Sequence, residues 1–276
     1  FATSTAKRNV RLFMAFRILF NIRFYYPVFM VMFLRYGITL EQFGLLNAVW
    51  AVVIVLLEVP SGALADLLGR KALLVAAAIM MTLEMLLLAI VPIGSSWVFP
   101  ALLLNRILSG AAEAFASGAD EALAFDSLKA AGKDGDWPRV LERLMQVGGL
   151  ATIFAMVTGS LVYSPDLIQV VMKWTGFASQ ITLDDTFRLP VWLTFFSGCG
   201  AILVTLSMRE LPRDHSENNI TLLDPFKQTL RTGYWILTNP LVLVVIAAGV
   251  LFDQPIRQLL VVSSQLYARI EIPVLY

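Results

Sequence analysis

The chain has 276 residues, of which 58% are hydrophobic and 15% are charged, and its formal net charge is +1. A soluble globular domain is about 45–50% apolar and about 25% charged, so this composition excludes an ordinary soluble domain and indicates a polytopic membrane protein. The single cysteine, Cys199, excludes a disulfide within the chain, and the single histidine, His215, lies in a polar segment typical of a solvated loop.

Seven apolar stretches are long enough to cross a hydrocarbon core of about 30 Å, which takes about 20 helical residues. We expect these spans near residues 10–36, 42–64, 72–93, 97–126, 139–163, 188–208 and 240–268. With a cytoplasmic N-terminus, the inner segments hold Lys7, Arg8, Arg11, Arg70, Lys71, Lys129, Lys133, Arg139, Arg143, Arg209, Arg213, Lys227 and Arg231, and the outer segments hold Arg35, Lys173, Arg188 and Arg269. Because basic residues collect on the cytoplasmic side, this bias predicts a multi-pass protein of the inner or plasma membrane with its N-terminus inside.

A short charged turn, Gly-Ala-Leu-Ala-Asp-Leu-Leu-Gly-Arg-Lys at 62–71, separates the second and third spans. Gly62 and Gly69 allow close helix approach and positive φ where the chain reverses. Asp66 can cap a helix start, and Arg70 and Lys71 mark the cytoplasmic side. The turn is therefore expected at the inner water interface, since lipid cannot satisfy irregular backbone.

This decapeptide resembles the loop between the second and third helices of the major facilitator superfamily, whose pattern is Gly-x-x-x-Asp-x-x-Gly-Arg-Lys/Arg. The matching residues are Gly62, Asp66, Gly69, Arg70 and Lys71. The resemblance implies an all-α polytopic membrane protein with a six-helix bundle in 1–208, a cytoplasmic linker in 209–239 and the first helix of an incomplete second bundle in 240–276. A basic turn between two unrelated membrane helices is the alternative interpretation.

The fourth span carries Arg106, Gly110, Glu113, Ser117 and Asp120 at steps of four, three, four and three. This spacing places all five on one helical face. Charges within a span are costly in lipid, so we expect Arg106 and Glu113 to face one water-accessible cavity at different depths. The alternative is that other helices neutralise these charges, which then only specify packing. Arg106 and Gly110 also resemble the Arg-x-x-x-Gly core of the fourth-helix motif of proton-coupled members of the superfamily.

Two other spans carry charges near mid-depth. Arg23 lies in the first span, and Asp253 and Arg257 lie one helical turn apart in the seventh. In the superfamily, helices 1, 4, 7 and 10 line the central cavity. The resemblance therefore implies a transport cavity or proton pathway that contains Arg23, Arg106, Glu113, Asp253 and Arg257.

The segments outside the spans suggest three further features. Acidic residues at the inner end of the fourth span could form ion pairs across an inner gate: Asp120, Glu121 and Asp126 would pair with Arg70, Lys71, Arg139 and Arg143. A solvated surface explains these acidic residues equally well. Within the linker, residues 222–236 have the pattern of an amphipathic interfacial helix. The outer segment 164–187 is expected to form a short surface helix and a loop.

The sequence contains no phosphate-binding loop, no cluster with metal-ligand spacing, no nucleophile–base arrangement and no nucleic-acid patch. We therefore expect neither an enzyme nor a resident cofactor or metal, and no nucleic-acid partner. The expected function is secondary active transport of a small solute by alternating access in the lipid bilayer, with protons as a candidate coupling ion.

The charges near mid-depth favour an organic anion slightly. The basic residues Arg23, Arg106 and Arg257 outnumber the acidic residues Glu113 and Asp253. The alternative function is that of a membrane sensor or assembly partner that shares the fold and does not transport.

Overall fold

The computed structural model describes residues 2–174 and 180–210, together with 231, 234–236, 238–245 and 248. Every regular element within these residues is a helix, and no strand occurs among them. Six stretches are long and apolar enough to cross a membrane, namely Ser4–Arg35, Leu40–Gly62, Arg70–Ile90, Val98–Ala130, Asp134–Tyr163 and Leu183–Ser207. They match the first six predicted spans and indicate a multi-pass membrane protein. Of the seventh predicted span, only 240–245 and 248 are described, and they are helical.

The first span is interrupted in its middle. Helix α1 (Ala2–Asn21) is followed by the short 3-10 helix η1 (Tyr26–Val28) and by α2 (Phe29–Arg35). Pro27 lies in the first turn of η1. A proline cannot donate a hydrogen bond to the carbonyl four residues earlier and its ring collides with that carbonyl, so a continuous helix through this position is disfavoured.

The second and third spans are helices α3 (Leu40–Leu68) and α4 (Arg70–Ile90). Thr39 and Gln42 form a capping box that fixes the start of α3. Gly69 alone separates the two helices, with φ at 102°, a conformation that favours glycine. The chain therefore reverses within the predicted turn, although α3 extends further into it than expected.

The fourth span consists of two helices, α5 (Val98–Ala116) and α6 (Ala119–Ala130). Gly118, with φ at 73°, separates them. The prediction that Ser117 and Asp120 continue the helical face of Arg106 is therefore wrong, because α5 ends at Ala116. The left-handed conformation at Gly118 turns the chain before Asp120, which lies in the first turn of α6.

The remaining elements follow in order. The 3-10 helix η2 (Asp134–Asp136) leads into α7 (Trp137–Tyr163), the fifth span, and α10 (Leu189–Ser207) forms the sixth. Between them lie α8 (Pro165–Trp174) and α9 (Leu183–Thr186), which confirms the predicted short surface helix in 164–187. Helix α10 ends next to the predicted bundle boundary at residue 208.

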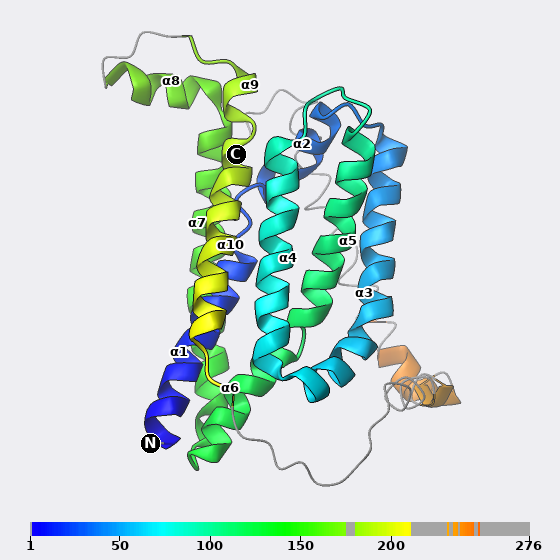
Figure 1. Ribbon diagram of the computed structural model, residues 1–276, viewed down its shortest axis with the longest axis vertical. Coiled ribbons are helices and arrows are strands. Elements are labelled where there is room, and N and C mark those ends of the chain that lie inside the picture. The colour runs from blue at the N-terminus through cyan, green and yellow to red at the C-terminus, as the bar shows by residue number, and fades with distance from the viewer. Residues whose placement is uncertain are drawn as a thin grey trace.

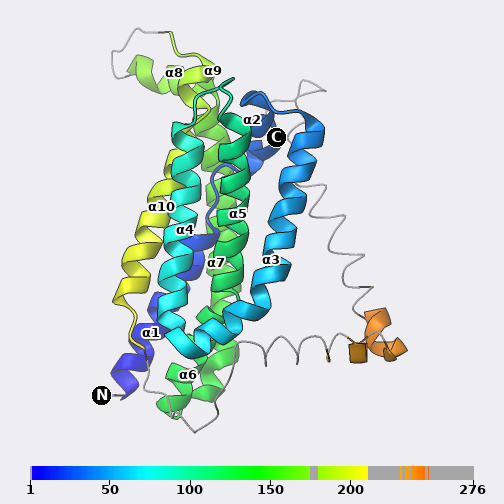
Figure 2. The same cartoon turned by 45° about the vertical axis from the view of Figure 1, so that its right-hand side comes forward.

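The long helices lie side by side, with α4 between α10 and α5 and with α3 at one edge (Figure 1). The end that holds α6 also holds the start of α1 and the turn between α3 and α4, whereas α8 and α9 lie at the opposite end (Figure 2). We call these the α6 end and the α8 end.

Helix α4 is the central helix of the bundle. Of its most apolar stretch, 56% is buried, against 11% for α3 and 17% for α7. Two apolar clusters surround it. One cluster lies towards the α8 end and includes Phe29, Phe33 and Met85. The other lies towards the α6 end and includes Phe16 and Met81. The polar residues described next lie at the level between these two clusters.

Candidate functional site

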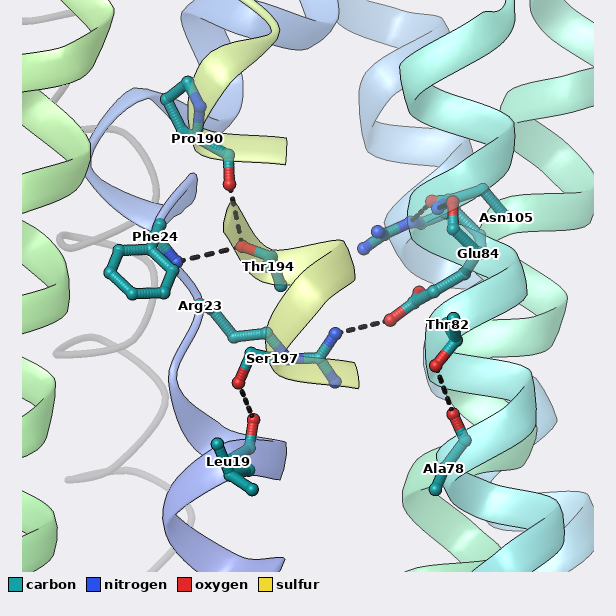
Figure 3. A network of polar contacts seen from close by, with 11 residues as sticks. Leu19, Arg23, Phe24, Ala78, Thr82, Glu84, Asn105, Pro190, Thr194 and Ser197 are labelled. Atoms are coloured by element: carbon teal, nitrogen blue, oxygen red, sulfur yellow. Dashed lines mark hydrogen bonds and ion pairs between the residues drawn. The ribbon is translucent and has the colours of Figure 1, made fainter. Parts of the chain in front are cut away.

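The interruption of the first span lies against α10, whose side chains bind the freed backbone groups. The backbone N–H of Phe24 donates to Thr194 Oγ1 at 3.1 Å, and Ser197 Oγ donates to the carbonyl of Leu19 at 2.6 Å (Figure 3). Irregular backbone is tolerated at membrane depth only where protein or a water-filled cavity satisfies its polar groups. Helix α10 therefore makes the interruption compatible with a membrane span.

Helix α7 approaches the same interruption from another side. Gly159 packs so closely against the chain at Phe24 that a Cβ atom at residue 159 would lie 1.8 Å from the Phe24 carbonyl oxygen. Only glycine permits this contact. The interruption is thus held between α7 and α10.

A buried ion pair begins at this interruption. Arg23 Nη1 lies 2.5 Å from Glu84 Oε1 in α4, and the two side chains are 5% and 0% exposed (Figure 3). The guanidinium of Arg23 also lies 5.4 Å from the ring centre of Phe20. Since buried charges are stable only when paired, Glu84 is the group that permits Arg23 to lie inside the bundle.

The backbone of Glu84 extends this network to α5. Asn105 Nδ2 donates to the carbonyl of Glu84 at 2.8 Å, and Asn105 Oδ1 accepts from Arg106 Nε at 2.9 Å. The guanidinium of Arg106 lies 5.2 Å from the ring centre of Phe29 and 5.1 Å from that of Phe33. Aromatic faces attract cations, so these rings replace part of the hydration that Arg106 loses. Polar groups from the first span, α4 and α5 thus meet at mid-bundle.

A cavity of about 460 Å³ opens between α1 and α7 at the level of the interruption. Its lining combines two arginines with mostly apolar and small residues: Arg17, Ile18, Asn21, Ile22, Arg23, Tyr26, Leu144, Met145, Gly148, Gly149, Thr152, Ala155 and Met156. This volume and composition suit a small organic molecule with a few polar groups.

Both arginines in the cavity wall already have acidic partners. Arg17 Nε lies 3.1 Å from Asp120 Oδ2, and Arg17 Nη2 donates to Glu121 Oε1 at 2.9 Å. Arg23 is paired with Glu84. A charged ligand would therefore compete with carboxylates that are in place.

The residues that were predicted to line one transport cavity do not lie together in the described part of the chain. Arg23 lines the cavity, whereas neither Arg106 nor Glu113 does. Arg106 is buried, at 4% exposure, and Glu113 lies exposed on α5. The expectation that Arg106 and Glu113 face one water-accessible cavity therefore has no support from the cavity between α1 and α7. Asp253 and Arg257 lie outside the described residues.

The turn of the resembling motif binds residues from two other parts of the chain. Arg70 Nη1 forms an ion pair with Asp126 of α6. The backbone N–H groups of Arg70 and Lys71 donate to Glu210, at 3.2 Å to Oε1 and 2.7 Å to Oε2. A carboxylate at a helix N-terminus complements the helix dipole, so Glu210 stabilises the start of α4.

The ion pairs predicted at the α6 end are present in part. The predicted pairing of Asp126 with Arg70 is confirmed, whereas Asp120 and Glu121 bind Arg17 instead. Gly62 lies within α3 and is exposed. The side chain of Asp66, predicted as a cap, lies outside the described residues, as does most of the predicted linker helix in 222–236.

The start of the linker is bound to α1. Asn9 Nδ2 donates to the carbonyl of Arg209 at 2.9 Å, and Asn9 Oδ1 accepts from the Arg209 N–H at 3.1 Å. Arg8 Nη2 donates to the carbonyl of Ser207 at 2.8 Å. Sequence reasoning missed these contacts, and it also missed the roles of Glu210, Asn105 and Thr194. The available signal was the polar character of Asn9, Asn105 and Thr194 within or next to apolar stretches.

No model of a known protein family matches this sequence, and no curated protein matches it. A half-open cavity, an interrupted span and a buried ion pair occur together at the middle of a membrane-spanning bundle.

Proposed function

We propose that the chain forms the first six-helix bundle, the linker and the start of a second bundle of a secondary transporter that resembles the major facilitator superfamily. It would move a small solute across the membrane by alternating access. The observation that supports this most is the cavity between α1 and α7, which opens at the interrupted first span and has Arg17 and Arg23 in its wall. Secondary transporters place substrate sites near the bilayer midplane, often beside discontinuous helices.

The charges inside the spans support the same proposal. Ionisable residues within membrane spans are costly and commonly mark substrate or ion pathways. Arg23 and Glu84 are nearly inaccessible, yet Arg23 also reaches the cavity wall. A pair in this position can respond to what occupies the cavity.

The turn at 62–71 supports the family resemblance. Its arginine binds an acidic residue of α6, and its helix start binds Glu210 at the beginning of the linker. These contacts join the turn, the fourth span and the linker at the α6 end, which we propose to be cytoplasmic. In an alternating-access cycle, contacts at one end of a bundle must form and break.

The charge of the solute remains a separate proposal. An organic anion would bind Arg23 only by sharing it with Glu84, and Arg257 lies outside the described residues. Arg106 lies away from the cavity wall. The test therefore includes anionic, cationic and neutral solutes of similar size.

The decisive experiment is solute counterflow in proteoliposomes that contain the full-length protein. We expect one solute class to exchange. Thr152→Trp, which places an indole in the cavity wall, should abolish this exchange. Ile153→Trp is the matched control, because Ile153 is 61% exposed on the same helix and does not line the cavity.

Two outcomes would contradict transport through this cavity. Exchange that survives Thr152→Trp would place the pathway elsewhere. Absence of exchange for every solute class would favour the alternative, a sensor or assembly partner whose buried charges specify packing. The Arg23–Glu84 pair, which is already neutralised, is the observation that favours this alternative.

Proton coupling is tested in the same vesicles. If Glu113 carries the proton, Glu113→Gln should abolish gradient-driven accumulation and spare counterflow, because the amide keeps the size of the side chain and cannot titrate. If accumulation persists with an unchanged pH profile, Glu113 is not the carrier, and Glu84→Gln and Asp120→Asn are the next variants.

A further inference from the structure

Helix α8 (Pro165–Trp174) differs in direction from the membrane spans. It follows α7 after a single residue, Ser164, and contacts α7 and α9. In both views it runs across the long axis of the bundle and projects beyond the other helices (Figures 1 and 2). A helix that leaves a span in this direction at the end of the hydrocarbon layer lies parallel to the membrane surface.

The residues of α8 divide into two faces. The apolar face has the helical spacing i, i+3, i+4, i+7 and consists of Leu167, Val170, Val171 and Trp174. Ile168 and Met172 widen this apolar face on one side. The remaining polar stripe consists of Asp166, Gln169 and Lys173, which have the spacing i, i+3, i+7. This separation is typical of helices that lie at a boundary between water and an apolar phase.

The apolar face is not covered by the described part of the chain. Val170, Val171 and Trp174 are 51%, 61% and 89% exposed, and no residue of α8 is buried. These three residues lie in the second half of the helix, away from its junction with α7. Exposed apolar patches of this kind mark contacts with a partner or a membrane.

We propose that α8 lies in the interfacial layer of the lipid bilayer, with Leu167, Val170, Val171 and Trp174 between the headgroups and the acyl chains. Helix α7 ends at Tyr163, so α8 begins where a membrane span reaches the surface. Tryptophan is enriched at this depth of membrane proteins. By the topology proposed above, the layer belongs to the outer leaflet.

The charges of α8 define the kind of lipid surface. Asp166 and Lys173 cancel, so the helix has no net charge among its side chains. Polybasic segments bind anionic lipids through charge, whereas α8 binds through apolar area and needs no anionic lipid. The surface that α8 contacts is therefore that of an ordinary zwitterionic bilayer. This contact fixes the depth of α7, a wall of the cavity, and is independent of whether the protein transports a solute.

The proposal is tested with the full chain in phosphatidylcholine nanodiscs, with Cys199→Ser as background. An environment-sensitive fluorophore is attached to Val171→Cys on the apolar face or to Lys173→Cys on the polar face of the same helix. At position 171 we expect emission at shorter wavelength, strong quenching by a lipid with a quencher near the headgroup, and weak quenching by iodide. At position 173 we expect the reverse.

The other outcomes overturn the proposal in distinct ways. Equal quenching of both positions by iodide would place α8 in water. Protection of position 171 from both iodide and the lipid quencher would show that protein covers the apolar face. Lipid quenching at position 171 that requires added phosphatidylglycerol would show that charge, rather than apolar area, holds the helix at the membrane.

Discussion

At the scale of single residues, the ion pair between Arg23 and Glu84 is expected to contribute much more to stability than an ion pair at the surface. Both side chains are almost fully buried, whereas the pair between Arg35 and Asp184 is 31% and 70% exposed. Removing one partner of a buried pair leaves an uncompensated charge, which typically costs about 3–5 kcal/mol. An exposed pair is worth about 0–1 kcal/mol because water screens it.

A double-mutant cycle can separate the pairing of these residues from their packing. We expect Arg23→Met and Glu84→Leu each to lower the free energy of unfolding by about 3–5 kcal/mol, and the double variant to recover most of this loss. Asp184→Asn is the control and should cost less than about 1 kcal/mol. Unfolding of the purified full chain in detergent measures all four variants. Additive losses in the double variant would show that Arg23 and Glu84 are not energetically coupled.

Such contacts could not be predicted from sequence. The mid-span position of Arg23 made it a candidate, but its partner Glu84 is 61 positions away and is brought to it only by the packing of the bundle. Thr194 and Glu210 act on backbone groups 170 and 140 positions away. A single sequence shows which charges are costly in lipid, and it does not show which residues compensate them.

At the scale of elements, the spans themselves were predictable, because a membrane span requires about 20 apolar residues in one run. Helices α4, α7 and α10 lie within about three residues of their predicted bounds. The interruptions were not predicted. Pro27 and Gly118 were available as signals, but an interrupted span is stable only if another helix binds its free backbone groups, and that depends on the tertiary fold.

The contact between α7 and the interrupted span yields a prediction about Gly159. Gly159→Ala places a methyl group where the Phe24 carbonyl lies, so the two segments must separate. We expect a loss of stability of about 1–3 kcal/mol or more, the usual cost of overpacking. Gly149→Ala on the same helix is the matched control, because no heavy atom lies within 4 Å of its added Cβ. Thermal unfolding in detergent compares the two variants, and equal midpoints would contradict the close contact.

At the scale of the whole molecule, the charge distribution predicts which end of the bundle faces the cytoplasm. The α6 end holds the basic turn at 69–71, and Leu68 beside it is 65% exposed. In a Cys199→Ser background, a membrane-impermeant maleimide should label Leu68→Cys only from the inside. Ser95→Cys, in the turn between α4 and α5 at the other end, should react only from the outside. The reverse pattern would overturn the proposed topology, and reaction of both variants on one side would contradict the span assignment.

The bonds between α10 and the first span also determine the order in which the molecule can be completed during synthesis. The N–H of Phe24 finds its acceptor, Thr194, only after 170 further residues have been made. At about 5–20 residues per second, the ribosome needs on the order of 10–30 s to supply that acceptor. During this interval the first span must keep its interruption hydrated or bound to another protein. The interrupted span therefore reaches its final structure only after the sixth described span has been made, although it precedes the other five in the chain.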